Sequence, residues 1–428
     1  MKNFRLGLII LVILIMKSSA FSAPDKVTLR LAWWGNPTRD ARTLKVVELY
    51  MAKNPNVTIE TETTSWAGYW DKLATQAAAN NLPDIIQQDY AYITQYAQKD
   101  LLLDLGPAVR AKKINLANVP DTFISGGKVN NKLYGISLGT NAFCLYYDPA
   151  VLQKAGVPAP APNWTWRDFE KMAVEIYSRT GVQTLPLSAT DPKVAFENMI
   201  RQTGKPFFNK YGTGLGFTDP QLLIEFYDLQ LRLLKANALI KPDLAFVATT
   251  PQESPFAKGL SWVQFCWSNQ VVSEQAAANR PIAISLLPRI ANPKRPGTFL
   301  KPSMFFSVSK ASANKDEAVK FINYFINDLE ANQILLAERG IPIIPKIRDA
   351  LMDIMPPVNR QIFEFINLAG NNNASPIDPA DPPGASEVLK IFRTIDQEVL
   401  YGATSAKEAA AKFMAQANEI LGKNKAAK

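Results

Sequence analysis

The chain has 428 residues, of which 47% are hydrophobic and 20% charged, a composition typical of a folded protein that is long enough for two domains. It contains no histidine, which excludes Ser-His-Asp and Cys-His catalysis and every zinc site that uses imidazole. The formal charge is +9, but Lys and Arg do not cluster with interleaved aromatics, so we expect no nucleic-acid partner. No pattern indicates a cofactor or a metal.

Residues 1–22 have the pattern of a secretory signal peptide. A basic start precedes an apolar run from Leu6 to Met16, and cleavage after Ala20 or Ser22 fits the small residues in this region. The alternative is a retained membrane anchor, but the run is short for a bilayer span. No cysteine lies near its end to carry a lipid. We therefore expect an exported, soluble protein of the periplasm without a lipid anchor.

Strand and helix patterns alternate at the start of the predicted mature chain. Residues 27–33 and 57–63 alternate as strands do, and a helix follows each, from Asp40 and around Trp70. A third short strand is predicted over 84–87. This order is the beginning of a doubly wound α/β sheet, whose ligands bind beyond the carboxyl ends of the strands.

Aromatic, amide and carboxylate side chains follow each of these three strands. Trp34 and Asn36 follow the first, Trp66 follows the second, and Gln88 and Asp89 end the third. An aromatic ring can stack on the apolar face of a sugar while polar groups pair with its hydroxyls. Each aromatic could equally fill the core. Their coincidence at one sheet edge favours a binding site.

Residues 132–148 are predicted to leave one lobe and enter another. Two apolar runs, 133–138 and 142–147, are joined by Gly139-Thr140-Asn141, whose residues tolerate unusual backbone angles. This pattern indicates a strand that crosses a hinge. It places Asn141 where a cleft between the lobes would be deepest.

The second half of the chain is mostly helical. A capping box at Thr165 begins a helix that runs to Gly181, and further helices are predicted over 192–203 and 219–236. Arg201 is a candidate partner for a ligand carboxylate. The alternative is that Arg201 and its neighbour Lys205 are solvated ends of the helix.

A strand over 261–266 ends in Trp267, and Asn269 follows, so an aromatic and an amide again stand at a strand end. After a buried strand predicted over 282–287, a strand over 304–308 is expected to return to the first lobe, and Ser303, just before it, is a further candidate ligand contact. The expected fold is α/β, with two doubly wound sheets joined by three hinge crossings. The predicted first lobe comprises residues 23–138 and 299–342, and the second lobe comprises 139–298 and 343–428.

The two cysteines, Cys144 and Cys266, both fall in predicted strands. An oxidising compartment would allow them to form a disulfide. Two buried free thiols are the other possibility, because the sequence does not give their separation.

The order of these features resembles the extracellular solute-binding proteins of carbohydrate ABC importers, similar in plan to maltose-binding protein. Four stretches carry the resemblance: 82–86 (Leu-Pro-Asp-Ile-Ile), 131–136 running into 145–148, 256–259 (Phe-Ala-Lys-Gly), and 307–310 followed by 314–318. The resemblance covers the mature chain. It implies a monomer without enzymatic activity that captures an oligosaccharide between its lobes and delivers it to ABC permease subunits in the membrane.

Within this family, the block 33–35 paired with 66–70 is similar to the branch that binds pectic oligosaccharides. By resemblance, the loops at Trp34, Trp66 and Asp89, the crossover at Asn141 and the Trp267 loop correspond to ligand-contacting places. Many relatives carry a carboxylate at the crossover position. The neutral amide of Asn141 would not repel a uronic acid, which favours an acidic ligand.

Two other functions are compatible with parts of the sequence. An exported polysaccharide-cleaving enzyme would need two carboxylates placed across a glycosidic bond, and the chain has many Asp and Glu residues. The layout with three passages argues against this enzyme. A receptor for a peptide or polyamine is opposed by the aromatic-rich loops and by the scarcity of acidic residues in them.

Overall fold

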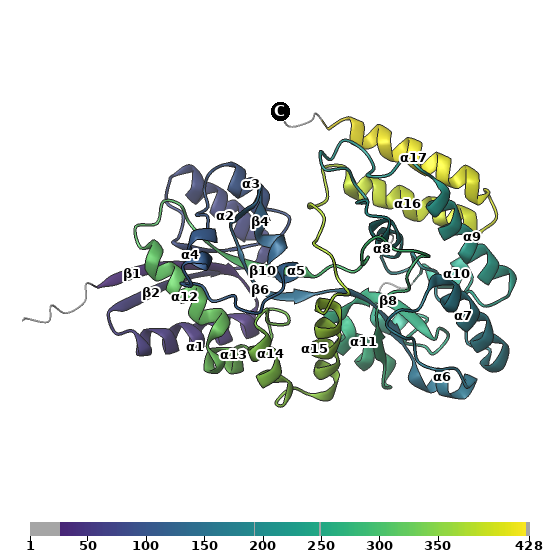
Figure 1. Ribbon diagram of the computed structural model, residues 1–428, viewed down its shortest axis with the longest axis horizontal. Helices are drawn as coiled ribbons and strands as arrows, with labels where there is room; N and C mark the ends of the chain where they lie inside the picture. The colour runs from purple at the N-terminus through teal and green to yellow at the C-terminus, as the bar shows by residue number, and fades with distance from the viewer. Residues whose placement is uncertain (1–25, 192, 248–249, 425–428) are drawn as a thin grey trace, which may run out of the picture.

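A computed structural model describes residues 26–191, 193–247 and 250–424. The predicted signal peptide over 1–22 lies outside the described residues. The chain forms two lobes that lie side by side and are joined by extended segments (Figure 1). One large apolar core fills the first lobe and the junction, and a second fills the other lobe. The predicted two-lobed α/β class is confirmed.

The first lobe is built on a five-stranded sheet of order β2-β1-β3-β10-β6. Strands β2, β1 and β3 are parallel, and β10 runs antiparallel to both of its neighbours, β3 and β6. Helices cover both faces, so strand residues are buried on both sides and β3 reads Ile-Ile-Gln-Gln with all four residues buried. The strands are β1 (Val27–Trp34), β2 (Val57–Thr64), β3 (Ile85–Gln88), β6 (Ile136–Asn141) and β10 (Lys301–Val308), with a small hairpin of β4 (Lys128–Val129) and β5 (Lys132–Leu133).

Helices of the first lobe follow the predicted alternation. In Figure 1, α2 and α3 lie above the sheet, and α1 and α13 lie below it. The helix α1 begins where Asn36 accepts a hydrogen bond from the backbone N–H of Arg39 at 3.0 Å. The helices are α1 (Pro37–Lys53), α2 (Trp66–Ala78), α3 (Ile93–Gln98), α4 (Gly106–Arg110), α5 (Asp121–Ile124), the 3-10 turn η1 (Ser125–Gly127), α12 (Lys315–Asn327) and α13 (Leu329–Leu335).

The second lobe contains a smaller sheet of order β8-β7-β9, formed by β7 (Phe143–Tyr147), β8 (Val263–Trp267) and β9 (Ala283–Ser285). Both pairings are antiparallel, so the doubly wound arrangement expected here is replaced by a three-stranded antiparallel sheet. Alternation along β7 divides its side chains between the cores: Phe143 and Leu145 face the second core, and Cys144 and Tyr146 face the first.

Helices make up the rest of the second lobe and its junction with the first. The capping box predicted at Thr165 is present, and Ser405 forms a second one at the start of α17. Helices α14 (Pro345–Met352) and α15 (Pro357–Gly370) lie at the junction and contribute to the first core. The other elements are α6 (Pro149–Ala155), α7 (Trp166–Thr180), α8 (Val194–Gln202), α9 (Gln221–Lys235), α10 (Pro242–Ala245), η2 (Pro251–Glu253), η3 (Ser268–Gln270), α11 (Val271–Ala278), α16 (Ala385–Leu400) and α17 (Ala406–Gly422).

The chain segments that pass between the lobes are hydrogen-bonded to one another. The strand β6 continues through Gly139 to Asn141 and is separated from β7 by a single residue. Thr140 exchanges backbone hydrogen bonds with Ile341, at 2.8 and 3.2 Å. A Cβ at position 139 would lie 2.4 Å from the carbonyl oxygen of Arg339, so glycine is required there because two chain segments approach closely.

The two cysteines are free thiols buried opposite each other on β7 and β8. The thiol of Cys144 donates to the carbonyl oxygen of Cys266 at 3.2 Å. Burial raises the pKa of both thiols. The sequence left a disulfide and two buried free thiols as alternatives, and the structure has the free thiols.

Within the described ranges, none of the helices combines the length and the apolar character that crossing a bilayer requires.

Candidate functional site

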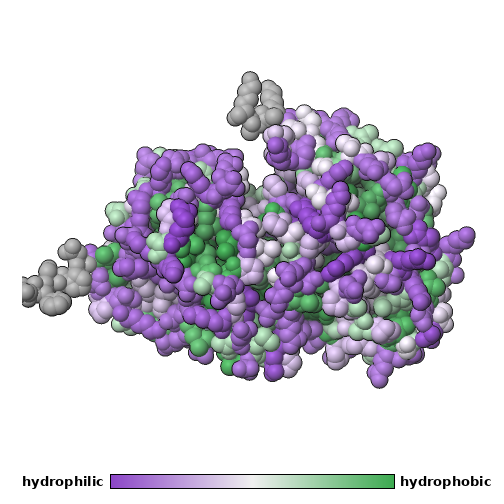
Figure 2. All heavy atoms as spheres, in the orientation of Figure 1, coloured by the Kyte–Doolittle hydropathy of each residue, from purple (hydrophilic) through white to green (hydrophobic). Residues whose placement is uncertain are grey.

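Two adjoining pockets lie between the lobes and share Asp89, Trp267 and Lys301 in their walls. The larger, about 560 Å³, reaches the hinge at Asn141 and Ser303. The smaller, about 290 Å³, extends along residues 377–381. Figure 2 shows the surface hollowed between the two lobes. We call the two pockets together the interlobe groove; its dimensions are those of a small-molecule site.

The aromatic wall of the groove is Trp267, at the end of β8. Its half-buried ring meets Phe143 edge-on with centroids 5.5 Å apart, and Phe299 at 6.1 Å. The side chain of Gln270 accepts a hydrogen bond from the backbone N–H of Trp267 at 3.1 Å. These contacts fix the strand end and leave part of the indole exposed in the groove, where it can stack against a ligand.

Asn141 and Ser303 stand at the floor, where the hinge strands pair. The Asn141 side-chain oxygen is buried and, among the described residues, has no hydrogen-bond partner. It is therefore an unused acceptor beside the groove, and the role of Asn141 as a ligand contact stays a prediction. The hydroxyl of Ser303 is used within the fold, since it contacts the carbonyl oxygens of Gly139, at 3.0 Å, and Arg339. Ser303 thus holds two passages together at the edge of the groove.

Asp89 contributes the carboxylate from the first lobe. One carboxylate oxygen accepts the backbone N–H of Ala91 at 2.8 Å, which orients the side chain. Burial raises the pKa of Asp89, and the nearby Lys301 ammonium opposes that rise. Asn269, on the turn after Trp267, is exposed and lines the larger pocket from the other lobe. The groove therefore carries polar groups from both lobes.

The aromatic residues of the first lobe form a cluster of their own. Trp34 is only 7% exposed and packs against Trp66, Tyr69 and Trp70, with centroids 4.9, 5.2 and 5.5 Å away. Trp66 is 46% exposed at the edge of this cluster. Neither Trp34 nor Trp66 borders the interlobe groove. Their role as ligand contacts stays a prediction.

Asn36 and Gln88, also predicted from the first lobe, do not border the groove either. The side-chain oxygen of Asn36 caps α1. Gln88 is fully buried, and neither polar atom of its side chain has a hydrogen-bond partner among the described residues. Gln88 is the last residue of β3, and only the residue after it, Asp89, lines the groove.

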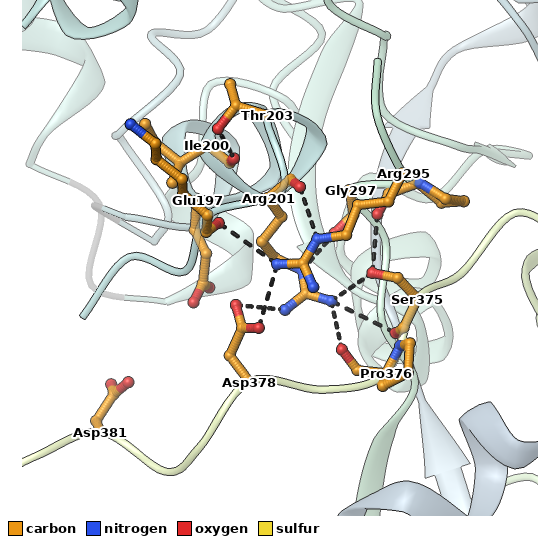
Figure 3. Close-up of polar contacts among 12 residues, drawn as sticks. Glu197, Ile200, Arg201, Thr203, Arg295, Gly297, Ser375, Pro376, Asp378 and Asp381 are labelled. Carbon is orange, nitrogen blue, oxygen red and sulfur yellow. Dashed lines mark hydrogen bonds and ion pairs between the residues drawn. The ribbon is translucent and has the colours of Figure 1, made fainter. Parts of the chain in front are cut away.

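Arg201 is completely buried, so the expectation of a solvated helix end is wrong for it, although Lys205 is exposed. Its guanidinium makes an ion pair with Asp378 at 2.5 Å and donates to the Ser375 hydroxyl at 2.7 Å and the Pro376 carbonyl at 2.8 Å. Figure 3 shows the side chain pointing at this segment. The hydrogen bonds of Arg201 are therefore made to residues 375–378, and they hold this segment in place as a wall of the groove.

Sequence reasoning missed that wall. Residues 377–381, between α15 and α16, line the smaller pocket together with Tyr90 and Lys193. Lys193 pairs with Asp381 at 2.6 Å, and the Tyr90 hydroxyl donates to the Asp378 carbonyl across the groove. The run Pro-Ile-Asp-Pro-Ala-Asp-Pro-Pro predicts an irregular segment. No local signal places it beside a helix almost two hundred residues earlier.

The geometry defines a class of protein. Two lobes are connected by paired passages, and a groove between them is walled by an indole, amides and a carboxylate from both sides. Among the described residues, no group of three or more Cys, Asp and Glu side chains is placed to hold a metal ion. The arrangement is that of a two-lobed binding protein that encloses a small solute.

The chain belongs to the family of bacterial extracellular solute-binding proteins, which matches residues 45–358. A lactose-binding protein of Rhizobium radiobacter is 26% identical over 340 residues, which cover 76% of each chain. An extracellular solute-binding protein family 1 structure from Alicyclobacillus acidocaldarius subsp. acidocaldarius DSM 446 is 29% identical with a TM-score of 0.86, covering 94% of this chain and 100% of that one. The resemblance inferred from the sequence is confirmed at the level of this family.

The fold also matches a periplasmic oligogalacturonide binding protein from Yersinia enterocolitica. The TM-score is 0.77 at 21% identity, and the alignment covers 92% of this chain and 99% of that one. At this identity the match shows a shared fold.

Proposed function

We propose that this protein captures an oligosaccharide in the interlobe groove and delivers it to the membrane subunits of an ABC permease. The observation that carries the proposal is the position of Trp267, whose partly exposed indole shares the groove with Asp89 and Asn141. A ring to stack on and polar groups around it are what a sugar requires. The family, and relatives named for binding lactose and oligogalacturonides, support the same ligand class.

Capture proceeds by closure of the lobes. The first lobe supplies Asp89, the second supplies Trp267, and Asn141 lies at the strand that connects them. Bending at the passages brings both sides onto one ligand, so a closed state is favoured by contacts that neither lobe can make alone. The permease then recognises the closed protein.

Calorimetric titration with acidic and neutral oligosaccharides tests the proposal. A matching sugar should bind and also raise the melting temperature, because a ligand bound only by the native state stabilises it. A panel in which no sugar binds, in a sample that melts cooperatively, would contradict it.

The protein is proposed to bind its ligand without cleaving it. The competing function is a secreted polysaccharide-cleaving enzyme, and the membership of the chain in a solute-binding family argues against it. Incubation with pectic oligomers followed by chromatography should return the oligomers intact. The appearance of shorter products at a rate proportional to protein concentration would favour the enzyme.

The mature protein is proposed to be a monomer, free of lipid, in the periplasm. A single groove is complete within one chain, which supports a monomer. Light scattering of the purified protein should give the mass of one chain. Release of the protein by osmotic shock, with a mass that matches cleavage after Ala20 or Ser22, is the result expected for its location.

A further inference from the structure

Lys301 stands at the centre of the interlobe groove. It is the first residue of β10, pairs with Asn141 across the hinge strands, and is exposed in the walls of both pockets. Its ammonium nitrogen lies 5.1 Å from the centroid of the Trp267 ring. Any sugar that stacks on that ring therefore meets this cation.

The other cations in the groove walls are already engaged within the protein. Arg201 is paired with Asp378 at 2.5 Å, Lys193 with Asp381 at 2.6 Å, and Arg39 with Glu338 at 2.9 Å. Arg339 is buried, where it donates to Thr43 at 2.8 Å. Lys301 differs because it makes no salt bridge within 4 Å to any part of the chain that the structure describes.

We propose that Lys301 determines specificity by binding the carboxylate of an acidic sugar unit that stacks on Trp267. The proposal rests on the proposed function and adds the ligand class, an oligosaccharide that contains uronic acid. A neutral sugar must displace the ammonium from the indole face with no charge to replace that contact. An acidic sugar offers the displaced ammonium a charge-assisted hydrogen bond. The flexible stem of lysine permits the small movement from ring face to ring edge.

Asp89 is the group that opposes an acidic ligand. Its carboxylate shares both pockets with Lys301 and is close enough to interact with that ammonium. A ligand carboxylate bound to Lys301 would lie near this second negative charge, which would repel it. Removing the charge of Asp89 should therefore strengthen the binding of acidic sugars relative to neutral ones.

The test is calorimetric titration of the full mature chain with trigalacturonate and with the neutral galactose trisaccharide of the same linkage. The wild type should prefer the acidic trimer. Lys301→Gln should weaken the acidic trimer by about fivefold or more and leave the neutral trimer within about twofold. Lys301→Arg should keep the preference, because the charge remains. Added salt should reduce the preference in the wild type and in Lys301→Arg only.

Lys310→Gln is the matched control. It removes the same charge just beyond the other end of β10, where Lys310 is exposed and paired with Asp100, so it should leave both affinities unchanged. Asp89→Asn is the second variant and should increase the ratio of acidic to neutral affinity. Circular dichroism melting checks that each variant is folded.

Two results would overturn the proposal about Lys301. One is a wild type that binds the neutral trimer as tightly as the acidic one, which would leave the proposed function intact. The other is a Lys301→Gln variant with unchanged affinity for the acidic trimer. Failure of the wild type to bind any oligosaccharide would overturn the proposed function and this inference together.

Discussion

In each lobe one strand ends at a tryptophan, and an asparagine follows two residues later: Trp34 and Asn36 in the first lobe, Trp267 and Asn269 in the second. The two tryptophans have different environments. Trp34, at the end of β1, is buried at the centre of an aromatic cluster. Trp267, at the end of β8, is half-buried and lines the interlobe groove. The same local pattern thus serves the core in one lobe and the candidate site in the other.

The difference comes from the elements that succeed each strand in the chain. After β1 the chain turns into α1, and α2 then brings Tyr69 and Trp70 against Trp34. After β8 the turn at 268–270 directs the chain away, and the aromatic rings that Trp267 meets among the described residues are Phe143 and Phe299, both edge-on. An aromatic residue at a strand end becomes available to a ligand when the next elements leave one side of it uncovered.

The largest effect is expected from Trp34→Ala. Removing a buried indole leaves a cavity inside the first core, and the free energy of unfolding should fall by about 3 kcal/mol or more. Urea unfolding monitored by circular dichroism measures it. Sugar affinity of the folded fraction should change little. A strong loss of affinity with unchanged stability would mean that Trp34 contacts the ligand directly and that the comparison of the two tryptophans is wrong.

A second stability effect is expected in the other lobe. Asp396 is fully buried, and its hydrogen-bond partners among the described residues are neutral: Gln230 at 2.8 Å and Ser188. Burial raises the pKa of Asp396 to about 6 from 3.8. Because the folded-state pKa lies above the unfolded one, stability from this group is fully present below about pH 4 and is lost as the pH rises through about 6.

Asp396→Asn keeps the shape and removes the charge: the amide oxygen can accept from Gln230, and the amide N–H can donate to the Ser188 hydroxyl in place of accepting from it. It should therefore increase the free energy of unfolding at pH 8 by about 3 kcal/mol and change it little near pH 4. Urea midpoints of wild type and variant at the two pH values provide the measurement. An increase of equal size at both pH values would show that the carboxyl ionisation is not its cause.

Trp267→Ala should have a smaller effect on stability and a clear one on binding. Affinity for the sugar ligand should fall about tenfold, equivalent to about 1.4 kcal/mol, because a stacking surface is lost. Calorimetry gives the affinity, and thermal melting without ligand gives the stability. Unchanged affinity would show that the ligand lies elsewhere than against Trp267.

The smallest effect is expected from Trp66→Ala. Trp66 is 46% exposed and lies outside the groove walls, so unfolding should change by less than about 1 kcal/mol. Affinity for long oligosaccharides should fall about threefold, and affinity for a disaccharide should be unchanged. A loss larger than that of Trp267→Ala would move the main stacking surface to the first lobe.

Sequence patterns were sufficient for most of the elements, because those depend on neighbours in the chain. The strands of the first lobe, the capping boxes at Thr165 and Ser405, and the hinge at 139–141 can all be derived from periodicity and capping chemistry. The second sheet was not predicted correctly. Short apolar runs such as 261–266 and 282–287 fit parallel and antiparallel pairing equally well.

The sequence by itself determined that this is a two-lobed α/β protein of the solute-binding family, since local periodicity and the order of motifs carry that information. Only the tertiary structure decided which strand-end residues share a groove. It placed Trp267, Asp89 and Lys301 together, enclosed Trp34, and bound Arg201 to residues 375–378. These outcomes depend on contacts between segments more than thirty residues apart in the chain, and no local pattern encodes such contacts.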